Sequence, residues 1–124
     1  MRGILILIGV LVFTGAALAQ DPIRTDGDKY KVLLENDKVR VLDYRDRPGE
    51  KTQRHWHPDY VLYALTSFKR QLTLGDGKII KREIKAGDVF WSPAQVHIGE
   101  NIGVSDTHVL IIELKEKGPG ARTE

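Results

Sequence analysis

Short runs of β-branched and aromatic residues, separated by turn residues at roughly eight- to twelve-residue intervals, restrict most strongly what this chain can fold into. The turns carry Gly, Pro, Asn and Asp, as in Pro48-Gly49 and Gly75-Asp76-Gly77. No stretch of useful length has the 3.6-residue hydrophobic period of a helix. About nine short strands in one small domain indicate an all-β sandwich or barrel.

The expected strands cover residues 30–34, 39–46, 52–57, 60–66, 71–74, 78–84, 89–91, 96–101 and 107–115. The sequence Gly75-Asp76-Gly77 between two of them predicts a hairpin turn. Residues 109–112, Val-Leu-Ile-Ile, are apolar on both strand faces. The last strand is therefore expected in the middle of a sheet rather than at an edge.

The expected domain covers residues 30–115, and the segments on either side of it have a different character. Residues 1–19 have the three parts of a secretory signal peptide: a positive start, an apolar stretch, and Ala17-Leu18-Ala19 before a cut. An uncleaved membrane anchor is the alternative. Residues 20–29 are expected to form a loose polar leader and residues 116–124 a disordered tail. We expect a periplasmic or secreted protein with no stable membrane anchor after cleavage.

Composition excludes several kinds of chemistry. The chain has no cysteine, which rules out disulfides and thiolate ligands. Its net charge is only +2, and positive and negative residues are interspersed, so nothing points to nucleic acid as a partner. No nucleophilic triad or phosphate-binding loop can be assembled. Any metal must be held by imidazole, carboxylate, amide or water.

Three of the four histidines suggest a metal site. His55 and His57 flank Trp56, so on a strand both imidazoles project from the same face. His97 on a neighbouring strand can complete a triad of imidazoles around a divalent ion. The alternatives are a surface His-x-His on an edge strand and, for His97, a hydrogen-bonded core residue.

Two motifs in the chain resemble those of the cupin superfamily, in each of which a glycine turn precedes metal-binding residues. The motifs are Gly49-x5-His55-x-His57 and Gly87-x5-Pro93 followed by His97-x3-Asn101. The resemblance implies a double-stranded β-helix, or jelly roll. It also implies one divalent metal ion inside the barrel, held by His55, His57 and His97. The residues do not distinguish iron, zinc, manganese, nickel and copper.

The chain departs from the cupin pattern at one ligand position. The first motif normally supplies a glutamate shortly after its second histidine, where this sequence has Val61 and Leu62, or Tyr60 in another alignment. Three neutral imidazoles and water still complete a zinc site or hold iron(II). Thiol and diketone dioxygenases resemble this arrangement. Without the carboxylate the site is one charge more positive, which favours an anionic ligand.

Four further residues are candidates for the pocket. Gln53 shares a strand face with the first two histidines. Tyr60 can donate a hydrogen bond to a bound ligand or pack at the rim. Asn101 is in phase with His97 and either lines the pocket or ends a strand. His108 is a substitute ligand or a general base, or has no chemical role.

These features predict an exported cupin that binds a small molecule in its barrel. As an enzyme it would be a metal-dependent dioxygenase, isomerase or lyase. Two alternatives to an enzyme remain. One is a non-enzymatic module that captures a small molecule or a metal in the same pocket, and the other is a structural cupin that binds no metal. The resemblance also implies a homodimer.

Overall fold

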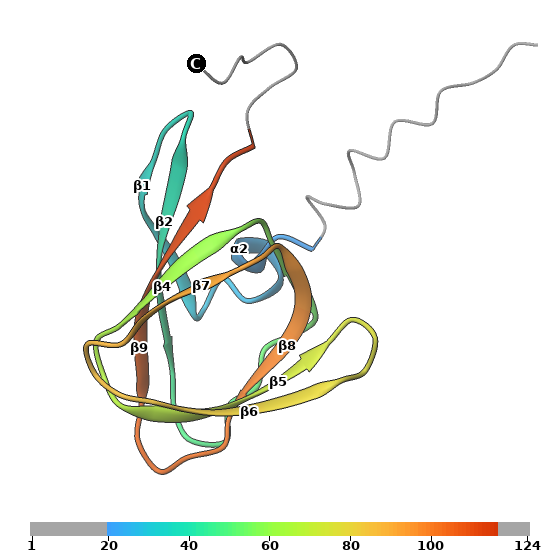
Figure 1. Ribbon diagram of the computed structural model, residues 1–124, viewed down its shortest axis with the longest axis vertical. Coiled ribbons are helices and arrows are strands. Elements are labelled where there is room, and N and C mark those ends of the chain that lie inside the picture. The colour runs from blue at the N-terminus through green and yellow to red at the C-terminus, as the bar shows by residue number, and fades with distance from the viewer. Residues whose placement is uncertain (1–19, 117–124) are drawn as a thin grey trace, which may run out of the picture.

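Two antiparallel β-sheets make up the structure, a computed structural model that describes residues 20–116 (Figure 1). One sheet has five strands in the order β1-β2-β9-β4-β7, and the other has four in the order β3-β8-β5-β6. The strands are β1 (Tyr30–Glu35), β2 (Val39–Asp46), β3 (His55–His57), β4 (Tyr60–Ala64), β5 (Phe68–Leu74), β6 (Ile79–Ile84), β7 (Val89–Ser92), β8 (Gln95–Asn101) and β9 (Thr107–Leu114).

The predicted all-β, double-stranded β-helix fold is confirmed, and each expected strand is present with ends shifted by a few residues. Strand β9 lies centrally, between β2 and β4, as its apolar sequence predicts. Strands β5 and β6 form the expected hairpin around Gly75-Asp76-Gly77. Gly77 has a φ of +88°, a conformation that glycine adopts without the steric cost of a Cβ.

Alternation of side chains along the strands builds the interior. On β9, Val109 and Ile111 are buried while their neighbours are half-exposed. Leu42 and Tyr44 of β2 and Leu62 of β4 join them. These three strands thus turn one apolar face inward, and burial of such side chains drives the two sheets together. The same inward phase carries the polar residues of the site.

Residues 20–29 are not the loose leader that their polarity suggests. Helix α2 (Pro22–Thr25) begins after Asp21, whose carboxylate accepts a hydrogen bond from the backbone N–H of Ile23, and Pro22 occupies the first turn. The Asp21 carboxylate also pairs with Arg40 of β2 at 2.8 Å. The ion pair fixes the segment to β2, and α2 also contacts β1 and β3.

The predicted signal peptide at 1–19 lies outside the described residues, as does all but the first residue of the predicted tail at 116–124. Between residues 20 and 116, no helix has the length and apolar character needed to cross a bilayer.

Candidate metal centre

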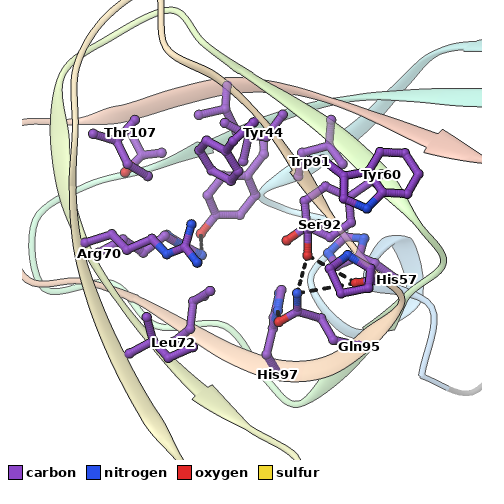
Figure 2. A pocket seen from close by; sticks show the side chains of 18 of the residues that line it. Tyr44, His57, Tyr60, Arg70, Leu72, Trp91, Ser92, Gln95, His97 and Thr107 are labelled. Atoms are coloured by element: carbon purple, nitrogen blue, oxygen red, sulfur yellow. Dashed lines mark hydrogen bonds between the residues drawn. The ribbon is translucent and has the colours of Figure 1, made fainter.

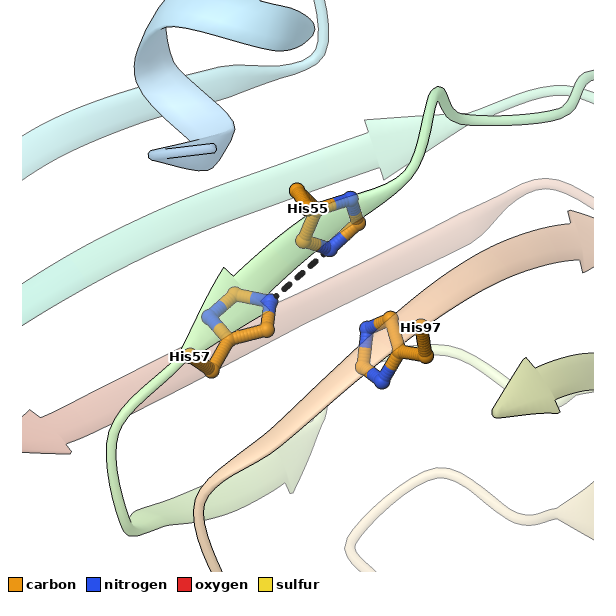
Figure 3. A group of neighbouring side chains, drawn as sticks. All are labelled: His55, His57 and His97. Atoms are coloured by element: carbon orange, nitrogen blue, oxygen red, sulfur yellow. Dashed lines mark hydrogen bonds between the residues drawn. The ribbon is translucent and has the colours of Figure 1, made fainter. Parts of the chain in front are cut away.

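Strand pairing brings the three predicted histidines together. In the antiparallel pair of β3 and β8, His55 lies directly opposite His97, and His57 is two residues further along the same face of β3. All three side chains turn into the barrel, with relative exposures of 0%, 1% and 4% for His55, His57 and His97 (Figure 3). The prediction that these residues share one site is therefore matched by their positions.

The three imidazoles converge closely enough for a single ion. One ligand nitrogen from each lies within 4.8 Å of the other two. The Nε2 atoms of His55 and His57 are 3.0 Å apart. Nitrogen ligands of a divalent metal lie about 2.0–2.1 Å from it, so two nitrogens at this spacing can bind one ion. The buried three-histidine group could therefore hold a metal.

An acceptor at each Nδ1 sets the orientation of the rings. The three Nδ1–H groups donate to protein oxygens: His55 to the carbonyl of Gln53 at 2.9 Å, His57 to Oε1 of Glu113 at 2.7 Å, and His97 to Oε1 of Gln95 at 3.1 Å. A backbone carbonyl and a carboxylate only accept, so these Nδ1 atoms carry the hydrogen in the neutral rings. Their Nε2 atoms then present lone pairs, as metal ligands do.

The orientation of the Gln95 amide is set by its own neighbours. Its nitrogen donates to the hydroxyl of Ser92, which leaves Oε1 to accept from His97 (Figure 2).

The Nε2 lone pairs of His55 and His57 face each other at 3.0 Å. Two lone pairs this close repel unless a cation or a proton lies between them. The chemistry of the donor set therefore fits a divalent ion.

The surroundings keep the histidines neutral. Burial lowers the pKa of His57 well below its usual value, and the neighbouring His55 and Arg40 lower it further. Burial, followed by the other two histidines, likewise places the pKa of His97 well below its usual value. Burial also lowers the pKa of His55. Neutral imidazole is the form that binds a metal, so the site is prepared for one at neutral pH.

Glu113 is a buried carboxylate that the sequence reading missed. It lies on β9, accepts from His57 through Oε1, and accepts from Nε of Arg40 through Oε2 at 2.8 Å. Burial raises the pKa of Glu113, while Arg40 opposes that rise. Its position on the Nδ1 side makes it a partner of His57 and not a member of the three-histidine group. The sequence signal for its burial is alternation along the last strand, which puts Glu113 on the same face as Val109 and Ile111.

A cavity of about 290 Å³ opens beside the histidines, between the two sheets (Figure 2). His57 and His97 line it, together with the buried Tyr30 and Tyr60. Most of its wall is aliphatic and aromatic. The hydroxyl of Tyr30 lies 3.2 Å from Nε2 of His55, so a phenol accompanies the imidazoles. Sequence reasoning did not identify Tyr30, since nothing in the first strand distinguishes it.

Tyr60 and Gln53 take different places. The Tyr60 ring lies 5.2 Å from that of His57, centroid to centroid, and lines the cavity. Gln53 is exposed, and its side-chain nitrogen donates to the backbone carbonyl of Thr25 at 2.8 Å. Its side chain is not among those that line the cavity, because strand β3 begins only at His55.

Asn101 and His108 also lie away from the cavity wall. The buried Asn101 amide donates to Asp46 at 3.1 Å and to the carbonyl of Ser105 at 2.9 Å, which ties the end of β8 to the next loop. His108 bonds to Asp43 at 2.8 Å on the opposite face of β9 from Glu113. The structure therefore gives both residues local partners outside the three-histidine group.

Solved structures with this architecture are numerous, although no protein-family model and no curated protein matches the sequence. A cupin domain from Bordetella pertussis Tohama I is 26% identical, with a TM-score of 0.64 over 70% of this chain and 92% of that one. An RmlC-like cupin with a double-stranded β-helix fold from Methanocaldococcus jannaschii is 18% identical, with a TM-score of 0.57 over 69% and 78% of the two chains.

Enzymes are also among these neighbours. The polyketide cyclase RemF from Streptomyces resistomycificus is 19% identical, with a TM-score of 0.55 over 73% of this chain and 66% of that one. Together these similarities support the cupin superfamily for this chain, and a fold of this kind hosts enzymes as well as other proteins.

Proposed function

We propose that this chain is an exported, metal-dependent cupin enzyme that acts on a small molecule in its barrel. In this proposal His55, His57 and His97 hold one divalent ion, and the adjoining cavity holds the substrate. The reaction is an oxygenation, an isomerisation or an elimination, depending on the ion. A small-molecule binding protein without turnover would use the same residues.

One observation carries the proposal: three buried imidazoles direct their lone-pair nitrogens toward one point beside a cavity. Each ring is held by an acceptor at Nδ1, so the arrangement does not depend on the ligand to form it. In a structural cluster of core histidines with hydrogen on Nδ1, protein donors would instead satisfy each Nε2 lone pair. In the described chain Nε2 of His57 faces Nε2 of His55, which has no hydrogen to donate.

A divalent ion in this site would polarise a substrate oxygen and orient it. The chain's own residues supply the rest of the environment. Tyr30 and Tyr60 line the cavity, and burial raises the pKa of both phenols, so each stays protonated and can donate a hydrogen bond to a substrate oxygen. The apolar wall excludes water from the bound molecule, which strengthens those bonds.

Metal-dependent depletion of a small molecule tests this function. Purified protein is loaded with iron(II), manganese, nickel, copper or zinc and incubated with a small-molecule extract of the source cells, which is then profiled by mass spectrometry. If the protein is an enzyme, a compound should disappear and a product should appear only with metal-loaded protein, and His97→Ala should abolish both changes. A compound that is retained by the protein but unchanged would favour the binding module.

Export is a separate part of the proposal. Cleavage after Ala19 would leave Gln20 first, and the carbonyl of Gln20 accepts from the backbone N–H of Trp56 at 2.9 Å. Cleavage of the peptide bond between residues 19 and 20 would thus leave this hydrogen bond in place. Cell fractionation with N-terminal sequencing of the recovered protein tests it: a mature chain beginning at Gln20 outside the cytoplasm is expected, and uncleaved protein in the cytoplasm would contradict export.

A further inference from the structure

Two arginines interrupt the otherwise apolar inner faces of β5 and β6. Arg70 lies in phase with Phe68 and Leu72 on β5, and Arg82 lies between Ile80 and Ile84 on β6. Both line the cavity beside the histidines, and no aspartate or glutamate within residues 20–116 does. A cavity lined by positive but by no negative side chains attracts anions.

We propose that this cavity takes a small, largely apolar carboxylate, whose carboxyl group is bound by Arg82. The inference rests on the proposed function, because it names the substrate class of the same site. The opposite end of such a molecule would lie toward the three histidines.

Arg82 is the arginine that is available. Within the described chain its guanidinium contacts the ring of Phe90, with Cζ 5.5 Å from the centroid, and it forms no ion pair with a carboxylate. The residue is exposed while it lines the cavity, so it stands where the cavity meets solvent. A guanidinium binds a carboxylate with two parallel hydrogen bonds, and a single guanidinium matches a single negative charge.

Arg70 has a different role. Its Nη1 donates to Asp46 at 2.8 Å and its Nη2 to the Tyr44 hydroxyl at 3.1 Å, so its charge is already paired. The guanidinium lies against Gly99, where a Cβ would be only 2.1 Å from Nη2. Arg70 is therefore a fixed part of the wall, and Arg82 is the group left to bind a ligand.

The cavity also sets the size and the body of the ligand. A volume of about 290 Å³ lies at the lower limit for sites that hold drug-sized molecules, so the ligand is smaller. Leu72, Ile80 and Phe90 line the space near the two arginines. Such a wall suits a ring or a short hydrocarbon chain, so the carboxylate would be the ligand's main polar group at this end.

Matched carboxylates and amides test the proposal. Benzoate, phenylacetate, 3-phenylpropanoate and hexanoate are each compared with their primary amides by calorimetric titration, with metal-loaded and with metal-free protein. Arg82→Gln removes the proposed partner, and Lys81→Gln is the control, because Lys81 is exposed on the same strand and faces away from the cavity. The best carboxylate should bind about tenfold tighter than its amide, and Arg82→Gln alone should abolish that preference.

The outcomes separate this inference from the metal proposal. An Arg82-dependent preference for carboxylates in protein that binds no metal would support the inference and contradict the metal centre. Tight metal binding with carboxylates no better than amides, or with equal losses in Arg82→Gln and Lys81→Gln, would overturn the inference and leave the metal centre standing. Absence of binding by every carboxylate in both forms would also overturn it.

Discussion

Replacement of Glu113 by glutamine should weaken metal binding without removing any ligand. Glu113 accepts two hydrogen bonds with two oxygens, from His57 at 2.7 Å and from Arg40 at 2.8 Å. Glutamine has only one oxygen. If that oxygen turns toward Arg40, the amide NH₂ faces Nδ1 of His57 and favours the tautomer with hydrogen on Nε2, which blocks the metal-binding nitrogen.

The expected loss follows from what outer partners of metal-bound histidines contribute. Removal of such a partner lowers metal affinity by roughly 10- to 100-fold, equivalent to about 1.4–2.7 kcal/mol. The metal-free variant should also lose about 1–3 kcal/mol of unfolding free energy, because the partly buried Arg40 loses its charge-assisted hydrogen bond to the Glu113 carboxylate. The side chains of Glu113 and Arg40 are only 3% and 14% exposed, so water replaces the lost bond poorly.

Metal affinity is measured by competition with a chelator at pH 7.5, and folding is checked by circular dichroism. Asp43→Asn is the matched control, because Asp43 bonds to His108 at 2.8 Å in a histidine–carboxylate pair that faces away from the cavity. Only the Glu113 variant should lose affinity. Wild-type affinity in a folded Glu113→Gln protein, or equal losses in both variants, would refute the reasoning that the carboxylate sets the tautomer of His57.

Two further predictions concern stability. The pKa values of His55, His57 and His97 are lowered in the folded protein, so below pH 6.5 the unfolded chain binds more protons than the folded one. Metal-free protein should therefore lose stability as pH falls, by up to about 1.4 kcal/mol per pH unit for each histidine. A urea-unfolding midpoint that stays constant between pH 6.5 and 5 would contradict this. Gly99→Ala should cost about 1–3 kcal/mol in the same assay because its Cβ displaces Arg70, and an unchanged midpoint would show that Arg70 moves freely.

The sequence predicts the strands well because period-two alternation and turn residues are local signals. Strand β9 could be placed centrally because its residues 109–112 are apolar on both faces. The folding of residues 20–29 was not predicted, since it depends on a long-range ion pair between Asp21 and Arg40. A polar segment shows no hydrophobic period, so periodicity gives no sign of its order.

The three histidines could be identified because their spacing in two motifs is visible in the chain. Their partners could not, because Glu113 and Tyr30 reach the site through sheet pairing rather than through sequence proximity. Gln53 shows the opposite error: alternation would place it with His55, but the strand begins after it and its side chain turns outward. Period-two reasoning holds only within the strand itself.

The metal content of the purified protein tests the central claim most directly. The protein is purified without a metal-binding tag beside the double variant His55→Ala/His57→Ala and the control His108→Ala, which removes the one histidine outside the site. Elemental analysis should find close to one divalent ion per chain in the wild type and in the control, and almost none in the double variant. Absence of metal from wild-type protein even after reconstitution, or equal metal in a folded double variant, would contradict a three-histidine centre.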